Sequence, residues 1–322
     1  MKILVTGGAG YVGSTLTRLL LESGYQVRVF DNLMHGGDSL LGVWTHPAFE
    51  FIKGDLRDAA AISDAVKNVN GVVHLAAIVG DPACAREPEL ARAINLDCSL
   101  SLLEESQRAG VSRFVFASTC SNYGRMADAD SYVDETSELR PISLYAETKV
   151  AVEKAILNYD GAEGFCPTAL RSATVHGISP RMRFDLTVNE FTMEMLTKKH
   201  LVVFGEQFWR PYIHVADFAR VIKLILESPA AKVCRQVFNI GSTDQNYQKQ
   251  QLVEMIKPFA PAAEVEYVHK NEDPRDYRVS FEKIKRELGF EITRTVTDSI
   301  KEISDMIQAG VINDFGNPKY RN

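Results

Sequence analysis

The stretch KILVTGGAGYVGSTL, residues 2–16, decides the fold of this 322-residue chain. It begins as a strand-like segment and runs through a glycine turn into an amphipathic helical pattern. Gly8, Gly10 and Gly13 match G-x-G-x-x-G, and Gly7, Gly10 and Gly13 also match G-x-x-G-x-x-G. Such glycines allow a tight turn, close backbone approach to a pyrophosphate and close packing of helix on strand. The stretch therefore predicts a dinucleotide site, with the phosphates facing the free N–H groups of the helix.

An acidic residue follows where a dinucleotide site requires one. Asp31 ends the next strand-like segment, YQVRVFD, 18 residues beyond Gly13. A carboxylate there binds the hydroxyls of the adenosine ribose and repels a 2′-phosphate. We therefore expect NAD rather than NADP as the cofactor. The alternative interpretation is an aspartate that only opens a loop.

Strand-like and helical segments alternate through the first half of the chain. FEFIKGD, GVVHLAA, RFVFAS and TALRSATV are strand-like, and helical patterns cover 58–68, 89–109, 145–158 and 216–228. This alternation predicts βαβ units and hence an α/β fold with a doubly wound parallel (Rossmann) sheet.

After about residue 174 the alternation of strand-like and helical segments becomes less regular, and Arg, Pro and aromatic residues become frequent. We expect a dinucleotide-binding domain over 1–173, to which 213–241 returns. A smaller, mostly C-terminal α/β substrate domain would take 174–212 and 242–322.

Composition narrows the class of protein. A net charge of −6 argues against a nucleic-acid partner, because phosphate binding needs a basic surface. No apolar run approaches the ~20 residues that span a bilayer, and the N-terminus lacks a signal-peptide core. The five cysteines form no CxxC pair, and the seven histidines show no metal-ligand spacing. We expect a cytoplasmic protein without disulfides, a metal site or membrane contact.

Tyr145 and Lys149, in SLYAETKVAVEK, stand four residues apart. On a helix this spacing places both side chains on one face, one turn apart. Taken alone, the pair is typical of ordinary helix surface. The other interpretation is a phenol whose proton is controlled by a neighbouring ammonium.

The segments TGGAGYVG, DNL, GDLRD, HLAA, ASTCSNYG and YAETK occur in this order along the first 150 residues. Together they resemble the extended short-chain dehydrogenase/reductase family of nucleotide-sugar epimerases and dehydratases. The resemblance continues more loosely through LRSATVHG, RPYIHVADFA and DPRDYRVSFEKIKRELGF. Within the family, ATVHGISPRMRFDLTVNEFT resembles a subgroup acting on bacterial surface or capsule sugars, which includes a GDP-heptose 4-dehydrogenase.

The resemblance implies a role for each matched position. Thr119, Tyr145 and Lys149 would be the catalytic set, and Tyr145 and Lys149 would also contact NAD. Fourteen further positions would line the NAD site: Gly7, Gly10, Tyr11, Val12, Gly13, Asp31, Asn32, Asp55, Leu56, Leu75, Ala76, Ala77, Ala117 and Ser118. With these roles, the catalytic interpretation of the tyrosine–lysine pair is favoured.

A tyrosine base needs its pKa lowered from near ~10 by roughly 3 units to work near neutrality. One close positive charge typically lowers such a pKa by ~1–3 units. We therefore expect Lys149, together with the oxidised nicotinamide, to lower the pKa of Tyr145.

The chain departs from the family pattern after Thr119. Family dehydratases carry an Asp-Glu pair there, whereas this chain has Cys120 and Ser121. Water elimination across C5–C6 of the sugar is therefore disfavoured. Both residues are expected beside the sugar, and Cys120 is either a small buried thiol, which we favour, or an acid-base group.

Further substrate contacts are implied by arginines in the second half. Arg210 and Arg275 match positions at which family members place arginine on the nucleotide diphosphate, a bidentate contact that suits guanidinium. Arg181, Arg183 and Asn189 would lie in the loop and helix that cover the nucleotide; the alternative for the two arginines is a merely solvated loop. Surface salt bridges are the alternative for Arg210 and Arg275.

The predicted function is NAD-dependent oxidation of a nucleotide-sugar hydroxyl, at C4, by an epimerase. A nucleotide-sugar 4-dehydrogenase that releases the ketone is the alternative. A 4,6-dehydratase, a non-catalytic NAD-binding protein and a dehydrogenase of a small alcohol fit less well. Helices 89–109 and 145–158 resemble those of the family's four-helix dimer interface, so a homodimer is expected.

Overall fold

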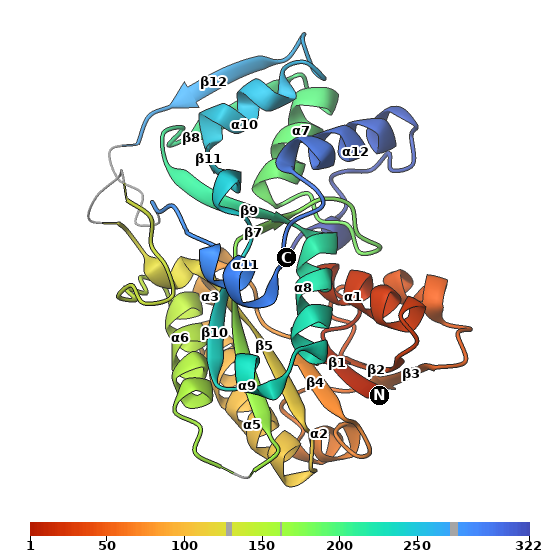
Figure 1. Cartoon of the computed structure of the whole chain (residues 1–322). Helices are drawn as coiled ribbons and strands as arrows, with labels where there is room; N and C mark the ends of the chain where they lie inside the picture. Colours follow the sequence, from red (N-terminus) through yellow and green to blue (C-terminus); the bar gives the residue numbers. More distant parts are fainter. Residues whose placement is uncertain (127–130, 162, 271–275) are drawn as a thin grey trace.

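The computed structural model describes residues 1–126, 131–161, 163–270 and 276–322. Its main element is a seven-stranded parallel sheet in the order β10-β6-β5-β4-β1-β2-β3 (Figure 1). The strands are β1 (Lys2–Thr6), β2 (Gln26–Asp31), β3 (Phe49–Lys53), β4 (Gly71–His74), β5 (Arg113–Thr119), β6 (Cys166–Ser172) and β10 (Gln236–Ile240). This confirms the predicted doubly wound α/β fold.

The order of the strands places a crevice beside β1. The chain lays down β1, β2 and β3 in one direction and then returns to form β4 on the other side of β1. At such a reversal the connections after two neighbouring strands lead to opposite faces of the sheet and leave a crevice at the carboxyl ends. The glycine turn follows β1 directly, so it lies at this crevice.

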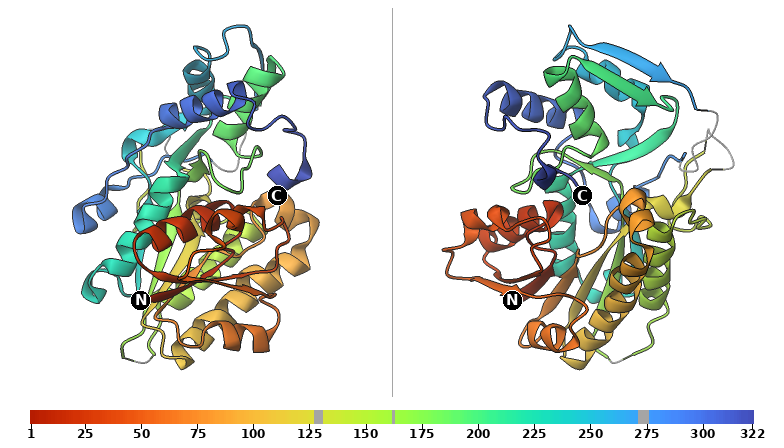
Figure 2. Two further views of the ribbon diagram at one scale, coloured as in Figure 1. Left: turned by 90° about the vertical axis from the view of Figure 1, so that its right-hand side faces the viewer. Right: turned by 180° about the vertical axis from the view of Figure 1, so that it is seen from behind.

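Both faces of the sheet are buried, which explains why its strands are almost continuously apolar. Along β1, Ile3 and Val5 join one hydrophobic cluster, and Leu4 joins the other. Figure 2 shows the helices in layers around the sheet. The helices of this part are α1 (Tyr11–Glu22), α2 (Ala59–Ala65), α3 (Asp81–Arg86), α4 (Pro88–Arg92), α5 (Cys98–Arg108), α6 (Leu144–Leu157), α8 (Val215–Glu227) and α9 (Ala230–Val233).

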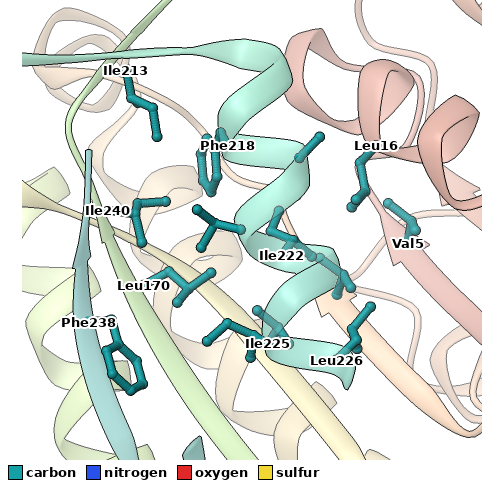
Figure 3. Packing of buried hydrophobic residues seen from close by; sticks show 14 of the residues in the cluster. Val5, Leu16, Leu170, Ile213, Phe218, Ile222, Ile225, Leu226, Phe238 and Ile240 are labelled. Atoms are coloured by element: carbon teal, nitrogen blue, oxygen red, sulfur yellow. The ribbon is translucent and has the colours of Figure 1, made fainter. Parts of the chain in front are cut away.

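Helix α8 is the centre of the first cluster. Its Phe218 and Ile222 are buried between Leu16 of α1 and the sheet residues Leu170 and Ile240 (Figure 3). Burying such a side chain contributes roughly 1.5–3 kcal/mol. A segment more than 200 residues from the N-terminus thus holds α1, and with it the glycine turn, against the sheet.

The second half forms smaller sheets. The predicted strand TALRSATV is interrupted at Ala173: β6 ends at Ser172, and β7 leaves the large sheet to pair with β9. The remaining elements are β7 (Thr174–His176), α7 (Thr187–Thr197), β8 (His200–Phe204), β9 (Trp209–His214), β11 (Asn246–Gln248), α10 (Lys249–Ile256), β12 (Glu264–Val268), α11 (Glu282–Leu288) and α12 (Val296–Gln308). No helix in the described ranges is long and apolar enough to cross a membrane.

Part of the expected substrate domain packs with the large sheet instead. Val279, Phe281 and Ile284 belong to the cluster that also holds α8 and β10. Their apolar side chains cover the edge strand β10, which would otherwise expose part of its face. This segment therefore adds to the core of the large sheet, and the assignment of 242–322 to a substrate domain stays a prediction.

His74, the last residue of β4, is fully enclosed next to the cavity. Its Nδ1 lies 2.7 Å from the Thr6 hydroxyl and its Nε2 lies 2.8 Å from the Ser99 hydroxyl. Burial, with a smaller contribution from Lys149, lowers the pKa of His74 to about 3. Between pH ~3 and ~6.5 the ring is therefore neutral in the folded protein, whereas the histidine of the unfolded chain is charged.

We predict an acid-sensitive contribution of His74 to stability. Between pH ~6.5 and ~3 the unfolded chain binds a proton here that the folded chain does not. The free energy of unfolding should therefore fall by about 1.4 kcal/mol per pH unit as the pH decreases. His74→Gln should remove this slope, measured as the difference from wild type in urea titrations at several pH values. Thr6→Val is the control, because it removes a hydrogen bond and leaves the titrating ring, so it should keep the slope. Parallel curves for wild type and His74→Gln would contradict the prediction.

Candidate active site

A cavity of about 350 Å³ opens at the carboxyl ends of the strands, at the crevice beside β1. The structure brings the whole predicted cofactor set to its wall, together with all three predicted catalytic residues. The lining includes Gly7, Gly10, Tyr11, Val12, Gly13, Asp31, Asn32, Asp55, Leu56, Leu75, Ala76, Ala77, Ala117, Ser118, Thr119, Tyr145 and Lys149. Residues from six separate segments thus meet in one site.

The glycine turn has the close packing that its sequence requires. Gly7 has a φ of +73°, and its N–H donates to the Phe30 carbonyl at 2.9 Å. A Cβ on Gly13 would lie 2.1 Å from the Gly7 carbonyl oxygen. Neither position accepts a side chain, so the backbone itself forms the cavity wall.

The N-terminus of α1 is open to an anion. Gly10 is the N-cap, no side chain caps the helix, and its first turn holds no acidic residue. The first N–H groups of a helix have no partner within the helix, and they carry partial positive charge. Bare backbone and free donors fit the pyrophosphate of a dinucleotide.

Two carboxylates lie at the far end of this wall. The Asp31 carboxylate accepts hydrogen bonds from the N–H groups of Ala9 (3.0 Å) and Leu33 (2.8 Å). Burial raises the pKa of Asp31, and those two N–H groups and Arg181 oppose the rise. Asp55 is paired with Arg57 at 2.7 Å, and the hydrogen bond from Arg57 is the main reason why the pKa of Asp55 falls to about 2. Asp31 is placed to accept hydrogen bonds from ribose hydroxyls.

Tyr145 and Lys149 lie on the face of α6 that borders the cavity. The helix begins at an N-cap serine, Ser143, whose side chain accepts the N–H of Ala146 at 3.3 Å. The Lys149 ammonium donates to the Ala117 carbonyl at 2.9 Å and lies 5.8 Å from the centre of the Tyr145 ring. Burial lowers the pKa of Lys149 to about 8, so the ammonium is still mostly charged at neutral pH.

The expected lowering of the tyrosine pKa is not produced by the protein residues. Burial raises the pKa of Tyr145 above its usual value, and Cys84 and Asp81 raise it further. Arg183 acts in the opposite direction with a smaller effect. This corrects the sequence-based expectation: enclosure of the phenol outweighs the charge near it.

A buried ion pair lies beneath the catalytic residues. Glu153, one turn beyond Lys149 on α6, pairs with Arg171 of β6 at 2.9 Å. The other oxygen of this carboxylate accepts hydrogen bonds from the Asn122 amide (2.6 Å) and the Ser118 hydroxyl. Because these donors satisfy a fully buried carboxylate, the pair fixes α6 relative to β5 and β6.

Three predicted substrate residues do not line the cavity. Cys120 is buried in the core and donates to the Arg171 carbonyl at 3.2 Å, and burial raises the pKa of its thiol well above the usual value. Asn189 is fully buried and binds the Gly177 N–H at 3.0 Å. Arg210 donates to the Trp209 carbonyl at 2.6 Å and lies over the Tyr277 ring.

Cys120, Asn189 and Arg210 are thus not brought to the cavity wall, and their contact with substrate stays a prediction. Ser121, Arg181 and Arg183 do line the cavity. Arg275 lies outside the described residues.

Sequence reasoning missed several lining residues. Tyr277 reaches the cavity from the C-terminal segment, and its hydroxyl lies 3.4 Å from the Ser121 hydroxyl. It belongs to the segment DPRDYRVSFEKIKRELGF, in which the family resemblance implies a role only for Arg275. Thr174 and Asn322 also line the cavity. Thr174 was hidden in a strand predicted to be continuous, and Asn322 carries no signal in the sequence.

Fold and cavity together define an enzyme that uses a bound dinucleotide, with a tyrosine and a lysine at one end of the site. The chain belongs to the NAD dependent epimerase/dehydratase family, whose model matches residues 3–241. It is thus an NAD-dependent enzyme of the extended short-chain dehydrogenase/reductase type, which confirms the predicted family and cofactor.

Similar proteins include epimerases and dehydratases. A UDP-glucose 4-epimerase of Corynebacterium glutamicum is 32% identical over 320 residues, covering 94% of each chain. The structure of a UDP-glucose 4-epimerase from Thermotoga maritima with UDP-glucose has a TM-score of 0.85 at 29% identity, covering 97% of this chain and 100% of that one. A dTDP-glucose 4,6-dehydratase from Streptomyces venezuelae with NAD bound also has a TM-score of 0.85, at 26% identity, covering 96% and 98%.

We predict that Gly13→Ala disrupts the cofactor site. The added methyl group would overlap the Gly7 carbonyl, so the turn must open, at a cost of about 1–3 kcal/mol in stability. NAD affinity, measured by calorimetry, should fall at least about tenfold because the helix N-terminus moves away from the phosphates. Gly42→Ala is the control, since a methyl group there meets nothing within 4 Å. Unchanged NAD binding by Gly13→Ala would show that the turn is not the phosphate site.

Proposed function

We propose that this enzyme is a nucleotide-sugar epimerase that inverts the configuration at C4 through a 4-keto intermediate. Similarity to UDP-glucose 4-epimerases along nearly the whole chain supports this proposal. The observation that carries it is the distribution of carboxylates in the cavity. Among the described lining residues, the side-chain carboxylates are Asp55 and Asp31, which binds the glycine turn at Ala9; the Asp81 carboxylate acts on Tyr145 from outside the lining.

That distribution bears on the choice between reactions. Removing water across C5–C6 needs one group to take the C5 proton and another to protonate the leaving hydroxide. The two positions after Thr119 offer a thiol turned into the core and the hydroxyl of Ser121. Oxidation and reduction at one carbon require only one proton acceptor beside the hydride acceptor, which Tyr145 supplies. The site therefore favours epimerisation or dehydrogenation over dehydration.

The roles of the residues follow from their positions. Tyr145 takes the proton from the sugar hydroxyl, and Thr119 shares the hydrogen bond to that oxygen. NAD supplies the hydride acceptor and, when oxidised, a positive charge at the nicotinamide. Lys149, held by the Ala117 carbonyl, adds its own positive charge beside the phenol and binds ribose hydroxyls. Tyr145 returns the proton when the ketone is reduced from its other face.

We propose that the substrate diphosphate lies over Ser121 and Arg183, under the region formed by 174–212 and the C-terminal part of the chain. Arg183 is paired with Asp185 at 2.8 Å, so it must exchange or share this partner when a phosphate binds. Arg210 then lies behind Tyr277 and supports it: the Arg210 Cζ is 5.4 Å from the centre of the Tyr277 ring. The homodimer through residues 89–109 and 145–158 remains a proposal that analytical ultracentrifugation tests.

A 4-dehydrogenase that releases the keto sugar is the second candidate. The similarity of ATVHGISPRMRFDLTVNEFT to the subgroup with a GDP-heptose 4-dehydrogenase favours it. The two candidates share every step up to the ketone and differ in whether the ketone stays bound for reduction.

We predict that Tyr145→Phe lowers turnover at least about a hundredfold, the usual scale for losing a positioned proton acceptor. NAD binding should change little, because the ring remains and only the hydroxyl is lost. Turnover and NAD titration are measured on the same preparation. Tyr25→Phe is the control, since its hydroxyl binds Glu227 outside the cavity. A Tyr145→Phe enzyme with most of its activity would remove the phenol from the mechanism.

The fate of the hydride tests the proposed reaction. A panel of nucleotide sugars is incubated with the protein, and products are examined by mass spectrometry and NMR. With substrate deuterated at C4, an epimerase should give product of unchanged mass that keeps the label at C4. A dehydrogenase should give a ketone and stoichiometric NADH. A product lighter by the mass of water would refute both candidates and show that dehydration proceeds without the Asp-Glu pair.

A further inference from the structure

Arg181 is a buried cation on the cavity wall, and the carboxylates of Asp31 and Asp185 act on its charge only from a distance. Its side chain lines the cavity, and the residue is 6% exposed. One terminal nitrogen donates to the Arg321 carbonyl at 2.9 Å, whereas its buried Nε has no hydrogen-bond partner. Among the described residues, no carboxylate lies within ion-pair distance of Arg181. An unsatisfied buried charge is costly, so such a group calls for an anion from outside the protein.

The neighbouring arginine shows the contrast. Arg183 reaches the same cavity, but both oxygens of Asp185 accept its hydrogen bonds, at 2.9 and 2.8 Å. Burial and the nearby Arg183 lower the pKa of Arg181 to about 10, so it remains charged at neutral pH. Arg183 is therefore already paired, and Arg181 is the cation left available to a ligand.

The loop that carries Arg181 rests on the first turn of α1. The Ser179 hydroxyl donates to the Tyr11 carbonyl at 2.6 Å and lies 3.2 Å from the Ser14 hydroxyl. In return, the Tyr11 hydroxyl donates to the Gly177 carbonyl at 2.6 Å. These bonds fix the loop against the end of the helix that faces the phosphates, with Arg181 two residues beyond Ser179.

The segment Phe315–Asn322 holds Arg181 from its other side. The Phe184 N–H donates to the Tyr320 carbonyl at 2.9 Å, and the Phe184 ring stands edge-on to the rings of Phe315 and Tyr320. The Asn322 N–H donates to Asp185 at 3.0 Å. The buried Oδ1 of Asn322 also lacks a hydrogen-bond partner. The C-terminal segment thus places the Arg321 carbonyl where it orients the guanidinium before a ligand arrives.

We propose that Arg181 binds the pyrophosphate of NAD, opposite the glycine turn. The helix N–H groups then contact the pyrophosphate from one side and the guanidinium from the other, while Asp31 remains free for the ribose. This reassigns Arg181 from the substrate nucleotide, where the sequence placed it, to the cofactor. Its position against the first turn of α1 favours the cofactor, because this turn carries the helix N–H groups that face the phosphates. A guanidinium is suited to a diphosphate because it can donate two parallel hydrogen bonds.

The test compares ligands with and without a pyrophosphate. Dissociation constants of NAD, ADP-ribose and adenosine are measured by calorimetry on NAD-free protein, for wild type, Arg181→Met and Arg181→Lys. Arg181→Met should weaken NAD and ADP-ribose at least about thirtyfold, within the range of a lost charge-assisted hydrogen bond. Adenosine should change less than about threefold. The affinities of Arg181→Lys for NAD and ADP-ribose should lie between those of the other two proteins, because lysine keeps the positive charge but cannot donate two parallel hydrogen bonds.

Two controls separate this role from a structural one. Arg18→Met removes an arginine of α1 that pairs with Glu22 at the surface, and it should leave all three constants unchanged. UDP is titrated into NAD-loaded protein to test the substrate side of the cavity. If Arg181→Met weakens adenosine binding as strongly as NAD binding, Arg181 has only a structural role. If it weakens UDP binding alone, Arg181 belongs to the substrate site. Either result overturns the proposal. If Arg181→Met does not fold, the ratio of ADP-ribose to adenosine binding in Arg181→Lys decides.

Discussion

The close approach of α1 to the end of β1 is the constraint on which the rest of the site depends. With hydrogen in place of a methyl group on Gly13, the helix can begin against the Gly7 carbonyl. This contact directs the uncapped end of α1 into the crevice where the strand order reverses. Helix α8 packs on the sheet beside α1 and contacts it, and the loop at Ser179 packs on the first turn of α1. Three distant parts of the chain thus hold one helix terminus in place.

At the end of the cavity that holds Tyr145 and Lys149, the buried Glu153–Arg171 ion pair holds the catalytic helix in place. Tyr145, Lys149 and Glu153 follow one another at four-residue intervals on one face of α6. Two of them face the cavity, and the third is anchored to β6 and to Ser118 of β5. Removing one partner of such a buried pair typically costs about 3–5 kcal/mol, because a charge is left alone in the core. The pair therefore sets the height and rotation of the helix that carries the phenol and the ammonium.

The sequence predicted the parts of this structure that depend on local patterns. The glycine turn, the strand ends and the Tyr145–Lys149 pair could be predicted because each consists of particular residue types at fixed, short spacings along the sequence. The positions of Cys120, Asn189 and Arg210 were not readable, because each depends on which way a side chain turns relative to distant segments. Cys120 turns to a carbonyl on β6, and Asn189 turns to the loop at Gly177. Asn322 and Tyr277 reach the cavity from 120 or more residues beyond the catalytic helix, a contact that tertiary packing alone creates.

Burial has opposite consequences for the two catalytic groups, and together they explain how the site handles a proton. Burial raises the pKa of Tyr145, so the phenol keeps its proton at neutral pH. Burial also lowers the pKa of Lys149 to about 8, which leaves the ammonium mostly charged at neutral pH. Arg183 lowers the pKa of Tyr145, and the Lys149 ammonium lies 5.8 Å from the centre of the Tyr145 ring, but burial still raises the pKa of the phenol. A base at Tyr145 therefore requires one more positive charge close to the ring, of the kind that oxidised nicotinamide carries. Proton transfer and hydride transfer are in this way tied to the same oxidation state of the cofactor.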